Sequence, residues 1–397
     1  MNERRRALEL LRRIERESAF ASLLLTNDSG FVRTLVLGVL RWRSRLDFVI
    51  DSFATSKIEP EIRDILRLGA LQLLFMRVAP HAAVGETVAL VPLRARGFVN
   101  AILRKISKGA PEPADVATRT AHPQWLIDRW TRFYGAERAA KIAEANQELS
   151  YPDAMTDSPP ADATRSALVP GMWKLTGSSA DVDGFALDEG SAVIADIAAA
   201  AGSEVLDLAA APGGKSLVMR ARGARVVSND VSIARLRPLM RRSVSIVVSD
   251  GRMPPFARQF QVVLLDAPCS ATGTIRKNPE IKWRLREDDL ASFVELQKEL
   301  LSSALDLASE TVVFSTCSLE LEENDAVVDE ILRTRTDFIR GDVAKLVNEN
   351  VARWVENGVL RLTPEAGTDG FTAHVLFNIR RRGITGDPDG SLRAPSG

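Results

Sequence analysis

A change of periodicity near residue 185 constrains the fold more than any other feature of the chain. Beyond it, short runs rich in β-branched residues alternate with helical stretches such as 191–201 and 288–308. This alternation predicts an α/β domain in which helices cover both faces of a mostly parallel, doubly wound sheet. The expected strands lie at 204–208, 225–230, 245–250, 261–266, 311–316 and 373–380.

Residues 1–110 carry a different pattern. Apolar residues recur there at three- and four-residue spacing with arginines between them, and a further helix pair is expected at 122–149. We therefore predict an all-α domain over 1–145 and an α/β domain over 185–382. The intervening 146–184, rich in Pro, Ser, Gly and Asp, is expected to be a linker or a reduced subdomain, and 383–397 a disordered tail.

The charge is unevenly distributed along a chain of 397 residues with 52 basic and 52 acidic side chains. Residues 1–110 contain 19 Lys and Arg against 11 Asp and Glu, a balance of +8, and the remainder therefore carries −8. A basic front region indicates a polyanionic partner, although a solvated helical surface explains it equally well.

Several protein classes are excluded by composition. No apolar run is long enough to span a membrane, and the charged N-terminus lacks the features of a secretory signal. Two cysteines and three scattered histidines fit neither a disulfide framework nor a zinc site. We expect a cytoplasmic protein without a metal, and favour a monomer.

The stretch VLDLAAAPGGKS (205–216) forms a strand, a glycine-containing turn and the start of a helix. A phosphate-binding loop would need glycine where this chain has Ala209, although Gly214, Lys215 and Ser216 fit its end. The alternative is a turn that lets the backbone approach a nucleoside cofactor. Asp230 and Asp250, which follow the next two strands, favour this second interpretation because such carboxylates accept ribose or base hydrogen bonds. S-adenosylmethionine fits, since it has no polyphosphate to bind.

The two cysteines both follow predicted strands, and each is followed by a serine. Cys269 stands in LLDAPCS with Asp266 just before it, and Cys317 stands in FSTCS. Inert core thiols are the common alternative, but parallel strands should bring both to the ligand-binding edge of the sheet. Two thiols and a carboxylate beside a methyl donor indicate covalent catalysis on carbon 5 of a pyrimidine, in which a thiolate adds to carbon 6. On this reasoning Cys269 and Cys317 are interchangeable.

The motifs LDLAAAPGGKS, LLDAPCSATGTIRKNPEIKW and FSTCSLELEEN resemble those of the Sun/RsmB (NOL1/NOP2/Sun) family of RNA cytosine-5 methyltransferases. FVRTLVLGVLRWRSRLDFVI, LRLGALQLLFM and FVNAILRKI resemble the NusB-like RNA-binding domain of its rRNA-modifying members. The resemblance implies a Rossmann-like class I methyltransferase domain behind an all-α NusB-like domain, with S-adenosylmethionine as cofactor and small-subunit rRNA as substrate.

The resemblance also implies a role for each motif residue. Cys317 would be the nucleophile, Cys269 would assist breakdown of the adduct, and Asp266 would bind the target ring. The residues expected around the cofactor are Ala209, Ala210, Ala211, Pro212, Gly213, Gly214, Lys215, Asp230, Asp250 and Asp266.

Two other functions stay open on the sequence alone. One is a non-catalytic RNA-binding or antitermination factor on a methyltransferase scaffold, which would explain the basic front region but not the paired thiols. The other is a nucleotide hydrolase using the GGKS segment, which Ala209 disfavours.

Overall fold

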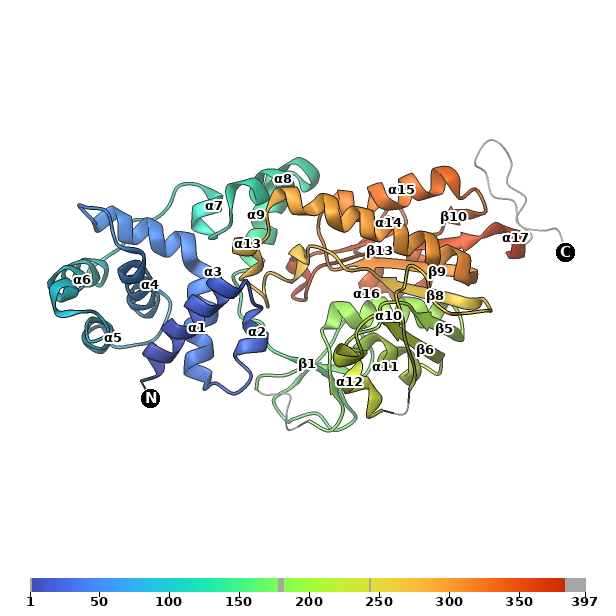
Figure 1. The fold of residues 1–397 in the computed structure, drawn as a ribbon, viewed down its shortest axis with the longest axis horizontal. Coiled ribbons are helices and arrows are strands. Elements are labelled where there is room, and N and C mark those ends of the chain that lie inside the picture. The colour runs from blue at the N-terminus through green and yellow to red at the C-terminus, as the bar shows by residue number, and fades with distance from the viewer. Residues whose placement is uncertain (1, 178–181, 243, 383–397) are drawn as a thin grey trace. The chain divides into compact units, whose positions relative to one another are not determined.

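The computed structural model describes residues 2–177, 182–242 and 244–382 (Figure 1). The chain divides into two compact units. One, the helical unit, contains the chain up to Glu148 together with Ile275–Leu285. The other, the sheet unit, contains Leu149–Thr274 and the chain from Arg286. The tail expected at 383–397 lies outside the described residues.

The helical unit confirms the all-α prediction, since its described residues form helices, turns and loops only. The N-terminus of α1 is capped by Asn2, whose side chain accepts hydrogen bonds from the backbone N–H groups of Arg4 and Arg5. None of the helices within the described residues is long and apolar enough to cross a membrane. The helices are α1 (Glu3–Glu17), α2 (Ala21–Leu24), α3 (Gly30–Phe53), α4 (Pro60–Leu74), α5 (Pro80–Val88), α6 (Leu93–Ile106), α7 (Val116–Arg119), α8 (Gln124–Tyr134), α9 (Ala136–Ala145) and α13 (Ile281–Arg284).

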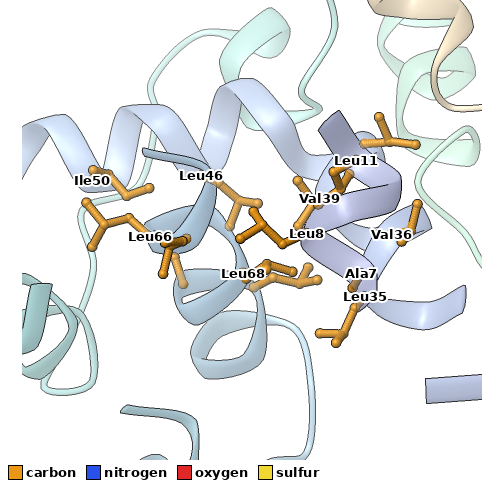
Figure 2. Packing of buried hydrophobic residues seen from close by; sticks show 14 of the residues in the cluster. Ala7, Leu8, Leu11, Leu35, Val36, Val39, Leu46, Ile50, Leu66 and Leu68 are labelled. Carbon is orange, nitrogen blue, oxygen red and sulfur yellow. The ribbon is translucent and has the colours of Figure 1, made fainter. Parts of the chain in front are cut away.

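The core of this unit lies between α1, α3 and α4, where aliphatic side chains from the three helices meet (Figure 2). Their spacing of three and four residues places them on one face of each helix, as the sequence pattern predicts. The core residues labelled in Figure 2 are Ala7, Leu8, Leu11, Leu35, Val36, Val39, Leu46, Ile50, Leu66 and Leu68.

Residues 275–285 join the helical unit although they follow Cys269 closely in the chain. Trp283 donates its indole N–H to the Leu40 carbonyl at 2.6 Å, and the Lys282 ammonium donates to the Arg41 carbonyl at 2.9 Å. The Glu280 carboxylate accepts the backbone N–H of Ala21 at 2.8 Å. These contacts attach the segment to α3 and α2 through backbone groups.

The sheet unit contains a nine-stranded mixed sheet, which confirms the predicted α/β class. Its path is β11-β12-β13-β9-β8-β5-β6-β7, with β10 paired to β13. The pairs from β9 through β7 are parallel, whereas β13 runs antiparallel to β9. The strands are β5 (Glu204–Asp207), β6 (Arg225–Asp230), β7 (Ser245–Val248), β8 (Phe260–Asp266), β9 (Ala308–Thr316), β10 (Phe338–Arg340), β11 (Val355–Glu356), β12 (Val359–Leu362) and β13 (Phe371–Asn378).

Both faces of the central strands are buried, which explains why the strands read as unbroken apolar runs. On one face Val262 and Leu264 of β8 pack in the cluster that contains α10 residues. On the other face Val263 and Leu265 pack in the cluster that contains α14 and α15 residues. The helices of the unit are α10 (Glu189–Ala201), α11 (Gly214–Ala221), α12 (Ile233–Met240), α14 (Leu290–Leu307), α15 (Asp325–Thr334), α16 (Glu349–Ala352) and α17 (Ile379–Arg382). The short 3-10 turns among its described residues are η1 (Thr272–Thr274), η2 (Glu287–Asp289), η3 (Leu321–Glu323), η4 (Val343–Leu346) and η5 (Pro364–Ala366).

Three strands of the region expected to be a linker or reduced subdomain, together with β4 just beyond residue 184, form a small four-stranded sheet in the order β2-β3-β1-β4. All its pairings are antiparallel. The strands are β1 (Asp153–Met155), β2 (Thr164–Arg165), β3 (Met172–Lys174) and β4 (Phe185–Ala186).

Candidate active site

Neighbouring parallel strands bring the two cysteines together. In the register of β8 and β9, Asp266 lies opposite Ser315, so the loops that carry Cys269 and Cys317 leave the same edge of the sheet. The two Sγ atoms are 3.4 Å apart, and both side chains are half-buried. The sequence expectation that the two thiols meet at one strand edge therefore agrees with the geometry.

The thiols affect each other's ionisation. The hydrogen bond to Cys317, with burial adding to it, raises the pKa of Cys269 well above its ordinary value. Two thiolates at this distance would repel, so the pair retains one proton after the first has left.

Asp266 lies at the end of β8 with both carboxylate oxygens engaged. Oδ2 accepts a hydrogen bond from the Lys215 ammonium at 2.6 Å, and Oδ1 accepts one from the Ser315 hydroxyl at 2.9 Å. Its side chain is about one-quarter exposed, at 23%. These contacts fix the orientation of a carboxylate that still reaches the cavity.

Lys215 is held by the protein itself. Besides Asp266, its ammonium donates to the Ser191 hydroxyl at 2.6 Å and lies 5.2 Å from the centre of the Phe371 ring. Burial acts to lower the pKa of Lys215, but the adjacent Asp266 carboxylate outweighs it and the pKa ends above its ordinary value. A phosphate-binding lysine would instead be directed at the ligand, which argues against nucleotide hydrolysis.

Ser216, the next residue of the GGKS segment, also forms hydrogen bonds with buried groups. The Ser216 hydroxyl donates to the fully buried Asp207 carboxylate at 2.6 Å and lies 2.8 Å from the Ser228 hydroxyl. Burial raises the pKa of Asp207 to about 7. Ser216 is therefore not free to bind a metal–nucleotide complex.

A cavity of about 410 Å³ opens at the carboxyl ends of the parallel strands. The strand order reverses here, because β6 and β7 continue from β5 on one side and β8 and β9 on the other. Ligands bind at such switch points in open α/β sheets. The lining residues are Leu208, Ala209, Ala211, Asp230, Val231, Arg235, Asp250, Gly251, Arg252, Asp266, Ala267, Pro268, Cys269, Leu296, Leu300 and Cys317.

The cavity brings together five of the residues expected around the cofactor, namely Ala209, Ala211, Asp230, Asp250 and Asp266. Asp230 is tied to the glycine loop, since its Oδ2 accepts the backbone N–H of Ala211 at 3.1 Å. Asp250 was expected to bind the adenine edge of the cofactor, but its carboxylate already has a partner within the protein. Arg252 binds it at 2.7 Å and lowers its pKa.

The other loop residues shape the turn. Ala210 packs with Leu236 and Leu239. Gly213, which follows Pro212, has φ +107°, and an added Cβ would approach a Leu239 methyl to 2.7 Å. At Gly214 an added Cβ would approach Leu187 to 2.5 Å. At Gly213, glycine is therefore favoured by both the packing and the backbone conformation.

Several residues of the site were missed by the sequence reasoning. Ser191 and Ser315 hold Lys215 and Asp266, and Arg252 holds Asp250. None of these three residues belongs to a motif that the sequence analysis identified, so only the tertiary contacts reveal them. Within the described ranges, no group of three or more His, Cys, Asp or Glu residues is arranged to hold a metal ion.

Residues 195–377 match the family described as 16S rRNA methyltransferase RsmB/F, and residues 1–108 match the NusB family. A "probable ribosomal RNA small subunit methyltransferase B" of Bacillus subtilis is 30% identical over 442 aligned positions, covering 95% of this chain and 98% of that protein. The chain belongs to the RsmB/F family of methyltransferases.

Other comparisons agree with this assignment. A putative methyltransferase of Mycobacterium tuberculosis is 32% identical, covering 95% of this chain and 96% of the relative. The crystal structure of PH0851 superposes with a TM-score of 0.73 at 24% identity, covering 94% of this chain and 98% of that one. NSun6 from Pyrococcus horikoshii, solved with SFG, has a TM-score of 0.52 at 16% identity, covering 65% and 98%. The two structures establish the likeness of fold.

Proposed function

We propose that this RsmB/F-family protein transfers a methyl group from S-adenosylmethionine to carbon 5 of a cytosine in small-subunit rRNA. The observation that carries the proposal is the pair of thiols 3.4 Å apart beside Asp266, in the wall of a single cavity. Methylation of an exocyclic amine would need neither thiol. Addition of a thiolate to carbon 6, in contrast, makes carbon 5 nucleophilic.

The cavity suits S-adenosylmethionine in size and chemistry. Its volume of about 410 Å³ is in the range of small-molecule sites. Small side chains at Ala209 and Ala211 leave room beside the backbone, and the Asp230 and Asp250 carboxylates can accept hydroxyl or amine hydrogen bonds. Bound there, the cofactor supplies an electrophilic methyl group.

The two cysteines have different roles in the covalent reaction. The Cys317 thiolate forms a C6–S bond, and the electrons of the C5=C6 bond become available at carbon 5. Once carbon 5 carries the methyl group, its proton passes to a base, the C5=C6 bond re-forms and the C6–S bond breaks, which returns the Cys317 thiolate. Cys269 assists this elimination. Once Cys317 is bonded to carbon 6, the Cys269 thiol, which lies 3.4 Å from Cys317 in the free protein, can lose its own proton to solvent and then accept the proton from carbon 5.

Asp266 and Lys215 provide the polar environment for the ring. Asp266 contacts the target base, and Lys215 and Ser315 keep its carboxylate in one orientation. Because Lys215 is buried and ion-paired, it also offsets negative charge that develops beside the thiols.

The RNA substrate is proposed on three grounds. The curated relatives include proteins named as ribosomal RNA small subunit methyltransferases. Residues 1–108 match the NusB family and carry the charge balance of +8 from 19 basic and 11 acidic residues. A basic helical surface binds phosphates, and its affinity should fall steeply with salt. The proposal also places the protein in the cytoplasm, where its thiols stay reduced.

The test is to incubate the protein with methyl-labelled S-adenosylmethionine and a small-subunit rRNA transcript or particle, then digest the RNA to nucleosides. We expect the label in 5-methylcytidine. Label in another nucleoside would contradict the cytosine-5 assignment. Cofactor binding without any transfer to RNA would favour the non-catalytic RNA-binding alternative.

A further inference from the structure

The two serines that follow the cysteines both bind the same residue. The Ser270 and Ser318 hydroxyls both donate to Oε2 of Glu323, the Ser318 contact measuring 2.5 Å, and the two hydroxyl oxygens are 3.0 Å apart. The serine of each Cys-Ser pair therefore has a structural role. Each serine ties the loop of its own cysteine to one shared carboxylate.

Glu323 is fully buried and fully hydrogen-bonded. Its other oxygen, Oε1, accepts the backbone N–H of Ser270 at 2.8 Å and the Gln297 amide N–H at 3.0 Å. Burying a carboxylate is costly unless its lone pairs are satisfied, and four donors meet that need here. The acid thus connects the loop after β8, the loop after β9 and helix α14.

The two loops also contact each other directly. The Gly273 N–H donates to the Cys317 carbonyl at 2.9 Å, and the Leu319 N–H donates to the Thr272 hydroxyl at 2.9 Å. A side chain at position 273 would clash, because its Cβ would lie 2.8 Å from the Cys317 carbonyl oxygen. The loops are therefore packed closely against each other, and Glu323 binds the serine that follows each thiol.

We propose that Glu323 is a positioning residue that holds Cys269 and Cys317 in register, so that one sulfur can attack the ring while the other remains close enough to assist release. This inference rests on the proposed cytosine-5 chemistry. A misplacement of about 1 Å at reacting groups can reduce the rate by about 100-fold. The negative charge of Glu323 also lies close enough to Cys269 to affect its ionisation.

The first test is Glu323→Gln, which keeps the shape of the side chain but replaces one acceptor oxygen with a donor. We expect kcat on small-subunit rRNA to fall by about 100-fold, while KM for RNA and the Kd for S-adenosylmethionine stay near wild type. Glu330→Gln is the matched control, because Glu330 is half-exposed on α15 and forms an ion pair with Lys298. It should retain the wild-type kcat.

The second readout needs neither RNA nor cofactor. Alkylation of each cysteine by iodoacetamide is followed against pH by peptide mass spectrometry. Removal of the Glu323 charge should move the Cys269 profile to lower pH, which a purely structural contribution to folding would not do. Unchanged kcat together with an unshifted Cys269 profile would overturn the proposal.

If Glu323→Gln does not fold, the double variant Ser270→Ala, Ser318→Ala decides the question. It removes both hydroxyl donors but leaves the carboxylate and its bonds to Ser270 N–H and Gln297. We expect a reduced kcat with unchanged cofactor affinity, and wild-type kcat would overturn the proposal. Failure of the cytosine-5 function itself would be recognised separately, because the wild-type protein would then form no 5-methylcytidine.

Discussion

The loop after β8 and the loop after β9 share a Cys-Ser pair and differ in the groups that surround their cysteines. Both follow adjacent parallel strands, both contain a Cys-Ser pair, and both are bound to Glu323. Strand β8 ends in Asp266, and Ala267 and Pro268 separate it from Cys269, whereas Cys317 follows directly after the buried end of β9. A nearly symmetric scaffold thus presents two thiols in unequal electrostatic environments, and unequal environments allow one to attack and the other to assist.

The largest effect is expected from Cys317→Ala. Methyl transfer to RNA should be lost, because no sulfur remains in the position that attacks carbon 6. Cofactor affinity, measured by calorimetry, should stay within about twofold of wild type, since substitutions that leave the binding contacts intact have small effects. Full turnover by this variant would contradict the assignment of Cys317 as the nucleophile.

Cys269→Ala is expected to stop the reaction at a later step. Without the assisting thiol, the protein–RNA adduct should accumulate and appear as a shifted band on a denaturing gel in the presence of S-adenosylmethionine. If the band appears with Cys317→Ala instead, the two loops have exchanged roles.

Asp266→Asn should have an intermediate effect. The amide keeps the shape of the side chain but loses the ion pair with Lys215, leaving a buried ammonium without its charge partner. We expect kcat to fall by about 100-fold, comparable to the loss of one preorganised polar group. Steady-state kinetics with the Asp288→Asn variant as control, an exposed acid of η2, would measure the effect. A kcat within twofold of wild type would contradict the role of Asp266.

The smallest effect concerns pH in the unmodified protein. Because the pKa of Cys269 is raised, its thiolate fraction increases only at a pH above that of an ordinary cysteine. Alkylation of Cys269 should therefore begin at higher pH than alkylation of a cysteine in a short control peptide. The measurement is peptide mass spectrometry after brief iodoacetamide treatment at a series of pH values. Equal alkylation profiles for Cys269 and the control peptide would contradict the raised pKa of Cys269.

The fold of the central sheet was predictable because buried parallel strands leave a strong local pattern. The runs ending at Asp230 and Asp266 coincide with β6 and β8. The hairpin of β11 and β12 could also have been predicted from the sequence, but the sequence analysis did not include it. Asn357 and Gly358 both have positive φ, at 53° and 79°, and an Asn-Gly pair between short apolar runs is a strong hairpin signal.

Other features could not be predicted from local sequence. The segment 275–285 is held in the helical unit by side chains that bond backbone carbonyls, such as Trp283 to Leu40, and such contacts leave no periodic pattern. Glu323 lies in an acidic stretch that looks like a solvated surface, yet it is fully buried. Its importance becomes visible only when the two Cys-Ser loops are seen to share it.

In the proposed mechanism Cys317, and not Cys269, attacks the ring. The most direct test is to react the wild-type protein with S-adenosylmethionine and small-subunit rRNA containing 5-fluorocytidine, in which fluorine replaces the proton that must leave carbon 5. The trapped adduct is digested with protease and nuclease and sequenced by mass spectrometry. We predict that the modified nucleotide is attached to the peptide containing Cys317; attachment to the peptide containing Cys269 would contradict the account.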